Sequence, residues 1–155
     1  MSGAAVHVAA QALTLLRPGR RRGSRTLCAA GLGAGAAAAL LAISAQRALG
    51  AAWRTSIAGT GDAPLVCSGP YAVVRHPVYT AFGGAALAVS LLAPTPAAAA
   101  ADALLLAGLQ LQVRAVEEPA LVAAYGEEYR RYSNATGRFL PCLRTPAGVS
   151  FRAPA

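Results

Sequence analysis

The sequence predicts an all-α integral membrane protein with about three apolar helices, including a C-terminal helical hairpin, followed by an amphipathic helix. Two numbers point to the membrane: 55% of the 155 residues are hydrophobic, and only 13% are charged. Soluble domains carry about 25% charged residues, so this chain has too few charges to coat a water-soluble surface. The third observation is a series of uncharged apolar runs, separated by segments rich in Gly, Pro and Arg.

The charge is strongly unbalanced. Fourteen basic residues, all of them Arg, stand against six acidic ones and give a formal net charge of +8. Such an excess favours an anionic partner, either nucleic acid or lipid headgroups. Because the chain is so apolar, we expect a lipid bilayer as partner and no nucleic acid. The three Cys residues are widely spaced and match neither a disulfide framework nor a zinc site, so no metal is expected.

Three segments divide the chain. They are a basic N-terminal segment (1–26) that is interfacial or flexible, a membrane-embedded domain (27–141) and a polar tail (142–155). Within the first segment, Ala4–Leu16 is too short to cross a hydrocarbon core about 30 Å thick as a helix. The basic cluster Arg17–Arg25 is expected either at anionic headgroups or in a solvated linker.

The clearest spanning helix is Leu27–Ala45, an uncharged run long enough to cross the bilayer. Gly31 and Gly35 have the spacing that lets helices approach closely, although such spacing also arises by chance in an Ala-rich segment. A signal peptide is the alternative, but the basic region begins late and further apolar runs follow. The next segment is polar and turn-rich, and Trp53 beside Arg54 is expected to lie at headgroup level.

Two shorter apolar runs, Val78–Ala93 and Ala97–Val113, are separated by Pro94-Thr95-Pro96 and predict an antiparallel helical hairpin. Asp102 is expected near the turn of this hairpin, on the membrane face opposite the functional site. The following segment, Glu117–Tyr132, has apolar residues at helical spacing with charged residues between them. It predicts an amphipathic helix that lies along a membrane face or covers a site.

A hairpin returns the chain to the membrane face that it left, so Gly69–Tyr79 and Arg114–Glu118 should lie side by side. Together they hold Arg, His, Tyr and Glu side chains where apolar helices meet water. Polar groups gathered at the membrane boundary of so apolar a chain indicate a functional site. The alternative is that the Arg side chains only extend to the headgroups, while the Glu side chains cap and solvate the next helix.

These motifs resemble the isoprenylcysteine carboxyl methyltransferase family, within a broader membrane methyltransferase group that also includes phospholipid N-methyltransferases. The resemblance runs from about Trp53 to Pro141. It consists of Gly-Pro-Tyr-x3-Arg-His-Pro-x-Tyr, an apolar hairpin, Arg-x2-Glu-Glu, then Tyr-Gly-x2-Tyr-x2-Tyr and Arg-Phe-Leu-Pro. Each motif is short, but their order and spacing together are specific.

The resemblance implies a pocket for S-adenosylmethionine between the hairpin base and the C-terminal helix, open to the cytosol. The cofactor-binding residues that it implies are Tyr71, Arg75, His76, Tyr79, Glu117 and Glu118. Arg114 matches a position that faces the reacting centre, so Arg114 and Glu118 are the expected catalytic residues. The residue types suit this cofactor, because carboxylates bind ammonium or hydroxyl groups, cations bind its carboxylate, and aromatic rings attract its sulfonium.

The expected function is therefore a multi-pass membrane enzyme that moves a methyl group from S-adenosylmethionine to a lipid-like acceptor at the cytosolic face. The acceptor is either the carboxyl of a prenylcysteine-type substrate or the amine of a phospholipid. The alternatives are a shortened, non-catalytic relative that acts as a packing or interaction module, and a nicotinamide-dependent membrane reductase. The intact Arg75-His76 and Glu117-Glu118 pairs favour the enzyme, as does the excess of Arg on the expected cytosolic face.

Overall fold

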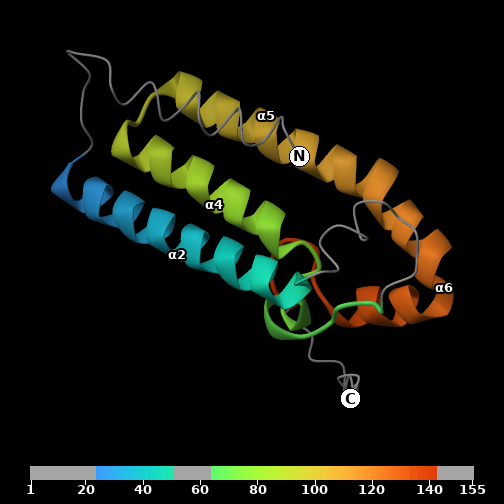
Figure 1. The fold of residues 1–155 in the computed structure, drawn as a ribbon. Helices are drawn as coiled ribbons and strands as arrows, with labels where there is room; N and C mark the ends of the chain where they lie inside the picture. Colours follow the sequence, from blue (N-terminus) through green and yellow to red (C-terminus); the bar gives the residue numbers. More distant parts are fainter. Residues whose placement is uncertain (1–23, 51–63, 143–155) are drawn as a thin grey trace. The chain divides into compact units, whose positions relative to one another are not determined.

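A computed structural model of the chain describes residues 24–50 and 64–142. Its contacts divide these residues into two units, and we describe each unit by itself. The first unit holds the described residues up to Leu40 together with Tyr79–Leu111, and the second unit holds the rest. The α-helices are α2 (Arg25–Leu49), α4 (Pro77–Leu92), α5 (Pro96–Gln112) and α6 (Glu118–Ala135), shown in Figure 1.

The predicted all-α fold class is confirmed. The expected spanning helix corresponds to α2, the two arms of the hairpin to α4 and α5, and the amphipathic helix to α6, each with ends shifted by a few residues. In the two described ranges there is no strand, and the one β-type pairing is an isolated parallel bridge between Val74 and Gly137. Two short elements were not predicted, a 3₁₀ turn at Gly69–Ala72 and a π-helix at Val113–Glu117.

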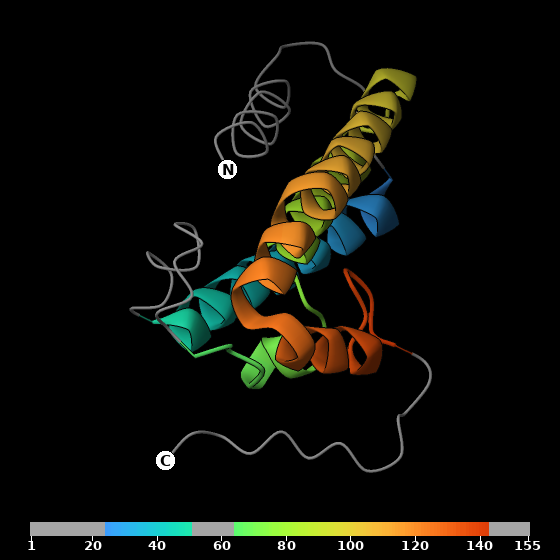
Figure 2. The ribbon, with the colours of Figure 1, turned by 90° about the vertical axis from the view of Figure 1, so that its right-hand side faces the viewer.

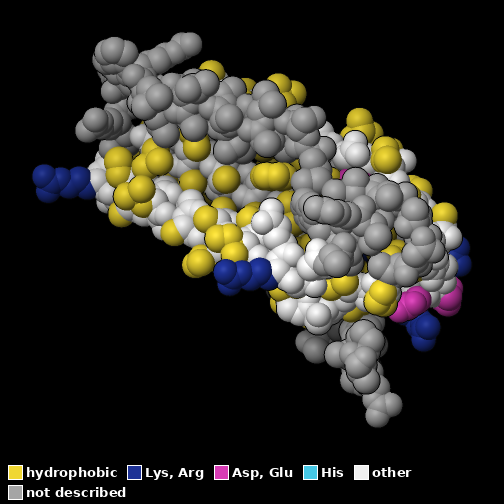
Figure 3. Space-filling view, in the orientation of Figure 1, with side chains coloured by type: hydrophobic (Ala, Val, Ile, Leu, Met, Phe, Trp, Pro, Cys, Tyr) yellow, Lys and Arg dark blue, Asp and Glu magenta, His cyan; other side chains and the backbone are white. Residues whose placement is uncertain are grey.

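The apolar helices have the length and surface of membrane helices. By length and composition, α2 can cross a membrane, and so can the helical stretch Pro96–Ala135, whose apolar part is α5. The helix α4 is also apolar but shorter. Large side chains such as Leu32, Leu40 and Leu104 are exposed, and Figure 3 shows hydrophobic side chains gathered over the helices of the first unit. Apolar surface of this extent is typical of a lipid-facing protein.

Small residues determine how closely α2 and α4 pack in the first unit. A Cβ atom added to Gly31 would lie 2.9 Å from the carbonyl oxygen of Ala88, and one added to Gly84 would lie 3.3 Å from the Cβ atom of Ala38. A Cβ atom on Gly35 would lie 3.6 Å from that of Ala88, which is an ordinary contact. The spacing of Gly31 and Gly35 therefore does serve helix packing, since the backbones meet too closely at Gly31 for a side chain.

The helices α4 and α5 form the predicted hairpin and lie side by side in Figures 1 and 2. Leu106 on α5 reaches within 3.3 Å of the position that a Cβ atom on Gly83 would take. Thr95 caps the start of α5, because its hydroxyl accepts a hydrogen bond of 3.1 Å from the backbone N–H of Ala98. Asp102 lies early in α5, and its side of the membrane stays a prediction.

The helix α6 is broken within its length. Gly126 has φ 55° and ψ −124°, a backbone conformation that is essentially restricted to glycine. Figure 2 shows the chain turning sharply within α6. The sequence predicts an unbroken helix over Glu117–Tyr132, because an isolated Gly in a helical pattern is usually tolerated. The break allows Tyr129 and Tyr132, on the second half of α6, to be buried.

Several predictions concern segments that lie outside the described residues. These are the interfacial segment Ala4–Leu16, the basic cluster Arg17–Arg25 apart from its last two residues, the pair Trp53-Arg54, and the tail beyond Cys142.

Candidate functional site

The first half of the site is the short segment before α4, in the second unit. A proline just inside a helical turn has its φ angle preset for that turn, and Pro70 occupies this place in Gly69–Ala72. Pro77 begins α4, and a residue that precedes proline is biased toward an extended backbone. Arg75 and His76 therefore lie in the short non-helical segment between the 3₁₀ turn and α4.

This segment pairs with the chain that follows α6. The backbone N–H of Arg75 donates to the carbonyl oxygen of Gly137 at 2.8 Å, and that of His76 donates to the carbonyl oxygen of Arg138 at 3.1 Å. Gly137 has no room for a side chain, since an added Cβ atom would lie 1.8 Å from the carbonyl oxygen of Leu140. The pairing thus places Arg75 and Arg138 on neighbouring segments of backbone.

The second half of the site is the π-helix Val113–Glu117 and the first turn of α6. The backbone N–H of Glu118 bonds to the carbonyl oxygen of Val113, which closes the wide turn. Insertions of this kind are frequent at functional sites, because they change the direction in which the following side chains point. Here Glu117 and Glu118, adjacent in sequence, both reach the same histidine.

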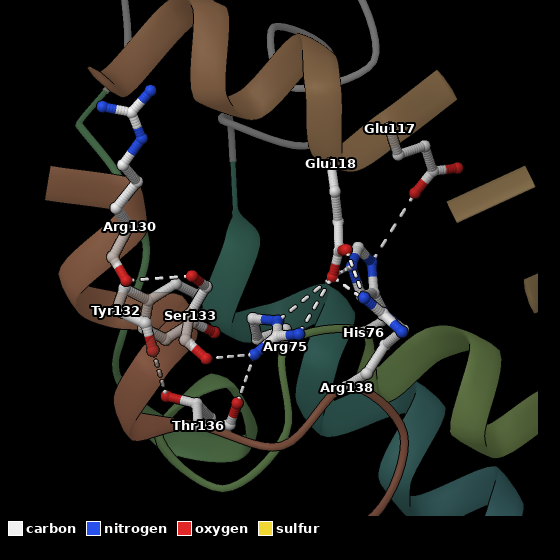
Figure 4. A network of polar contacts seen from close by, with 9 residues as sticks. All are labelled: Arg75, His76, Glu117, Glu118, Arg130, Tyr132, Ser133, Thr136 and Arg138. Atoms are coloured by element: carbon white, nitrogen blue, oxygen red, sulfur yellow. Dashed lines mark hydrogen bonds and ion pairs between the residues drawn. The ribbon is translucent and has the colours of Figure 1, made fainter. Parts of the chain in front are cut away.

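Glu118 is the centre of the polar network in Figure 4. Its Oε1 atom accepts hydrogen bonds from Nε and Nη2 of Arg75 at 3.2 and 3.1 Å. Arg138 binds both carboxylate oxygens, with Nε to Oε1 at 2.9 Å and Nη2 to Oε2 at 2.6 Å. Burial by itself raises the pKa of the Glu118 carboxyl, but hydrogen bonds and charge from Arg138 and Arg75 outweigh burial and lower it. Glu118 is therefore ionised at neutral pH.

Arg75 also binds the end of α6. Its Nη1 atom donates to the carbonyl oxygens of Ser133 and Thr136, where the helix leaves backbone acceptors without helical partners. A cation at this end also suits the negative end of the helix dipole. Arg75 thus ties Glu118, in the first turn of α6, to the last turn of the same helix, and it holds the two halves of α6 together across the break at Gly126.

His76 is a neutral imidazole between the two carboxylates. Its Nδ1 atom lies 3.6 Å from Oε2 of Glu117, and its Nε2 atom lies 3.7 Å from Oε1 of Glu118. Burial, helped by the charges of Arg75 and Arg138, lowers the pKa of His76 to about 4, against the opposite effect of Glu118. The resemblance implies that cations bind the carboxylate of the cofactor, and both Arg75 and His76 are among the expected cofactor-binding residues. Only the Arg side chain is a cation at neutral pH.

Three tyrosines surround this network. The hydroxyl of Tyr132 donates to the backbone carbonyl of Tyr71 at 2.7 Å, which joins α6 to the 3₁₀ turn. The rings of Tyr129 and Tyr132 meet edge to face with centroids 6.0 Å apart. Burial raises the pKa of both Tyr71 and Tyr129 to about 12, so these hydroxyls keep their protons.

The structure brings together most of the predicted site residues within the second unit. The members of this group are Tyr71, Arg75, His76, Glu117 and Glu118. Arg114 lies on the π-helix with its side chain exposed, and none of the described hydrogen bonds or ion pairs engages it. Tyr79 belongs to the first unit, where its ring packs against Phe82, so its part in the site stays a prediction.

Sequence reasoning gave no site role to the segment after α6. Arg138 is not among the predicted site residues, yet it makes the shortest of the described contacts to Glu118. Phe139 packs edge to face on His76 with ring centroids 6.0 Å apart. The signal that was present is the Arg-Phe-Leu-Pro motif, which begins at Arg138.

Part of this site lies within the stretch of sequence that matches a known protein family. The model of the isoprenylcysteine carboxyl methyltransferase (ICMT) family matches residues 32–123, which is more than half of the chain. The chain belongs to this family. The match contains Arg75, His76, Glu117 and Glu118 and ends before Arg138. No curated protein and no solved structure gave a match. Family membership, with the two candidate spans, identifies the chain as a membrane protein of a methyltransferase family.

Proposed function

We propose that this member of the ICMT family is an S-adenosylmethionine-dependent methyltransferase that acts on a lipid-like acceptor at the cytosolic membrane face. The observation that carries the proposal is the network around Glu118. In a chain with only 13% charged residues, Arg75, His76, Glu117 and Arg138 gather on this carboxylate. Charged side chains are costly to gather in so apolar a protein, and such clusters are typical of binding and catalytic sites.

The residues of this network fit the chemistry of the cofactor. Carboxylates accept hydrogen bonds from ribose hydroxyls or an ammonium, guanidinium groups bind a carboxylate, and phenol rings attract a sulfonium. A buried hydroxyl on Tyr129 that lacks a hydrogen-bond partner among the described residues is a further polar group suited to a ligand. When bound, S-adenosylmethionine supplies an electrophilic methyl group, which an acceptor atom takes as the carbon–sulfur bond breaks.

The protein contributes binding, alignment and exclusion of water. Arg75 and Arg138 keep Glu118 ionised and fixed in place, and Glu117 extends the negative edge of the site. Because Glu118 already accepts hydrogen bonds from two guanidinium groups, we assign it to binding and positioning. Tyr71 and Tyr79 are proposed aromatic contacts of the cofactor. For Tyr79, the proposal rests only on its place in the sequence motif.

A carboxylate acceptor suits these residues better than an amine. An amine must lose a proton when it is methylated, and a carboxylate does not. The pKa of Glu118 is lowered by its Arg partners, which makes this carboxylate a weak proton acceptor. Arg114 is an exposed cation that can hold an acceptor carboxylate in line with the methyl group. We therefore favour the carboxyl of a prenylcysteine-type substrate over the amine of a phospholipid.

The cytosolic orientation rests on the distribution of charge. Arginine is more frequent on the cytosolic side of membrane proteins. Of the described arginines, only Arg25 belongs to the first unit, and the second unit holds the others, namely Arg47, Arg75, Arg114, Arg130, Arg131 and Arg138. This supports a multi-pass protein with the site of the second unit facing the cytosol.

A non-catalytic relative is the second candidate. One observation favours it. The guanidinium group of Arg75 already hydrogen-bonds to Glu118 and to two backbone carbonyl groups of the protein. Such a network would hold α6 in place without any ligand. The two candidates differ in whether a methyl group is transferred.

Methyl transfer from radiolabelled S-adenosylmethionine tests the proposal. Membranes containing the chain receive either a prenylated cysteine with a free carboxyl or vesicles of phosphatidylethanolamine. We expect base-labile label, which marks a methyl ester, in the prenylcysteine only. In Arg114→Ala the KM for this acceptor should rise, whereas Arg131→Ala, which removes another exposed cation of the second unit, should leave it unchanged. Label in the phospholipid would show that the acceptor is the phospholipid amine and not the prenylcysteine carboxyl. No transfer to either would favour the non-catalytic relative.

A further inference from the structure

Tyr129 carries a buried polar atom that the packing of the protein does not explain. The side chain is among the largest that are fully buried, with 2% of the residue exposed. Its hydroxyl has no hydrogen-bond partner within the described residues. The neighbouring Tyr132 is equally buried, but its hydroxyl donates to the carbonyl oxygen of Tyr71 at 2.7 Å. Of two equally buried tyrosines about one helical turn apart, one thus has a hydrogen-bond partner for its hydroxyl and the other has none among the described residues.

An unpartnered hydroxyl in a buried position is unfavourable. A Phe side chain would fill the same space without the cost of removing a hydroxyl from water, and that cost is normally offset by a hydrogen bond. The ring of Tyr129 already makes its edge-to-face contact with Tyr132. The structure therefore gives a reason for an aromatic ring at this position and none, within the described residues, for its oxygen.

The surroundings of the hydroxyl are those of the site. The charges of Glu118, Arg75, Arg138 and Glu117 all act on Tyr129, while burial raises its pKa to about 12. The oxygen thus carries its proton, and its ring lies against Tyr132, which hydrogen-bonds to the predicted site residue Tyr71. The two arginines and the two glutamates balance in formal charge, and His76 is neutral. The phenol itself is neutral, so it offers a hydrogen bond without a counter-charge, which suits an uncharged polar group of a ligand.

We propose that the Tyr129 hydroxyl is a ligand-binding group of the site and hydrogen-bonds an uncharged polar group of the bound cofactor, such as a ribose hydroxyl. This assignment rests on the proposed function, because it takes S-adenosylmethionine as the ligand. It places the nucleoside part of the ligand at the second half of α6. The break at Gly126 is what directs this half, with Tyr129, toward Arg75.

The test compares Tyr129→Phe with Tyr132→Phe in the purified full chain. Two quantities are measured: the melting temperature without ligand, and the affinities for S-adenosylmethionine and for 5′-methylthioadenosine, which keeps the nucleoside and lacks the amino-acid part. In Tyr129→Phe the melting temperature should be unchanged or higher, and both affinities should fall by the same factor, about three- to tenfold for one hydrogen bond. Tyr132→Phe loses an internal hydrogen bond, so its melting temperature should fall by about 2–4 °C.

Each alternative result has a definite meaning. Unchanged affinities in Tyr129→Phe would overturn the assignment, and so would a fall in melting temperature as large as that of Tyr132→Phe, since that would reveal a structural partner. Loss of affinity for S-adenosylmethionine alone would overturn the uncharged-group assignment. If the unmodified chain binds no S-adenosylmethionine, the proposed function itself fails. If it binds and Tyr129→Phe binds equally well, only this inference fails.

Discussion

Glu118 and Glu127 both lie on α6 and both form an ion pair with Arg, yet their surroundings differ. The side chain of Glu118 is 15% exposed and contacts two guanidinium groups. That of Glu127 is 70% exposed and lies 3.4 Å from Arg130, three residues along the helix. Solvent and salt screen the second pair, whereas the first is partly shielded and supported by hydrogen bonds.

We therefore expect Glu118→Gln to lower the free energy of unfolding by about 1.5–3 kcal/mol, because Arg75 and Arg138 lose a charged acceptor. Glu127→Gln should change it by less than about 0.5 kcal/mol. Thermal unfolding in detergent measures both. Equal, small effects would show that Glu118 contributes no more than a surface carboxylate.

His76 predicts a specific dependence of stability on pH. Its pKa is about 4 in the folded protein and about 6.5 in an ordinary setting, so between these values the unfolded chain binds a proton that the folded chain does not. The contribution of His76 to the free energy of unfolding should be fully present above pH 6.5. It should fall as the pH is lowered toward 4, by at most about 1.4 kcal/mol per pH unit. The pKa of Glu118 is lowered in the folded protein, so protonation of this carboxylate reduces the stability further only when the pH falls below its ordinary pKa of 4.5.

The measurement is the melting temperature of the wild type and of His76→Gln between pH 7 and pH 5. The wild type should lose more stability than the variant over this interval. Parallel curves would mean that the imidazole titrates normally in the folded protein.

At the scale of single residues, the sequence predicted the groups that a short motif contains and missed those that the fold brings from elsewhere. Arg75, His76, Glu117 and Glu118 stand out because they are polar residues at the ends of apolar runs. Arg138 lies 20 residues after Glu118, and only the pairing of its backbone with His76 brings it to the site. Sequence patterns contain little information on such tertiary pairing.

At the scale of helices, the apolar runs predicted the elements and their order, since the length and periodicity of an apolar segment largely determine a helix. The π-helix and the break in α6 were not predicted, because both depend on how the chain packs after the helix has formed. At Gly126 the packed state requires a φ of 55°.

Replacement of this glycine tests the origin of the break. Gly126→Ala should destabilise the protein by about 1–3 kcal/mol although there is open space around the added Cβ atom, because the backbone conformation disfavours it. Gly108 on α5 also has open space but lies in regular helix, so Gly108→Ala should be neutral or stabilising by up to about 1 kcal/mol. Similar effects of the two substitutions on the melting temperature would contradict this account.

At the scale of the whole molecule, the scarcity of charge made the sequence interpretable. The apolar helices α2, α4 and α5 contain few charged residues, so the charges of the remaining segments stand out as candidates for a site. Composition and motif order were sufficient to predict a membrane protein of the ICMT family, and the family match over residues 32–123 confirms it. The identity of the acceptor could not be predicted from composition, because any lipid-like substrate suits an apolar surface.

The most direct test of the central claim is a calorimetric titration of the purified full chain with S-adenosylmethionine, made with the wild type, Glu118→Gln and Glu127→Gln. Our account predicts saturable binding at a single site, an affinity at least about tenfold lower in Glu118→Gln, and an unchanged affinity in Glu127→Gln. An absence of saturable binding by the wild type would contradict the proposed function. Equal affinities in the wild type and Glu118→Gln would contradict the location of the site.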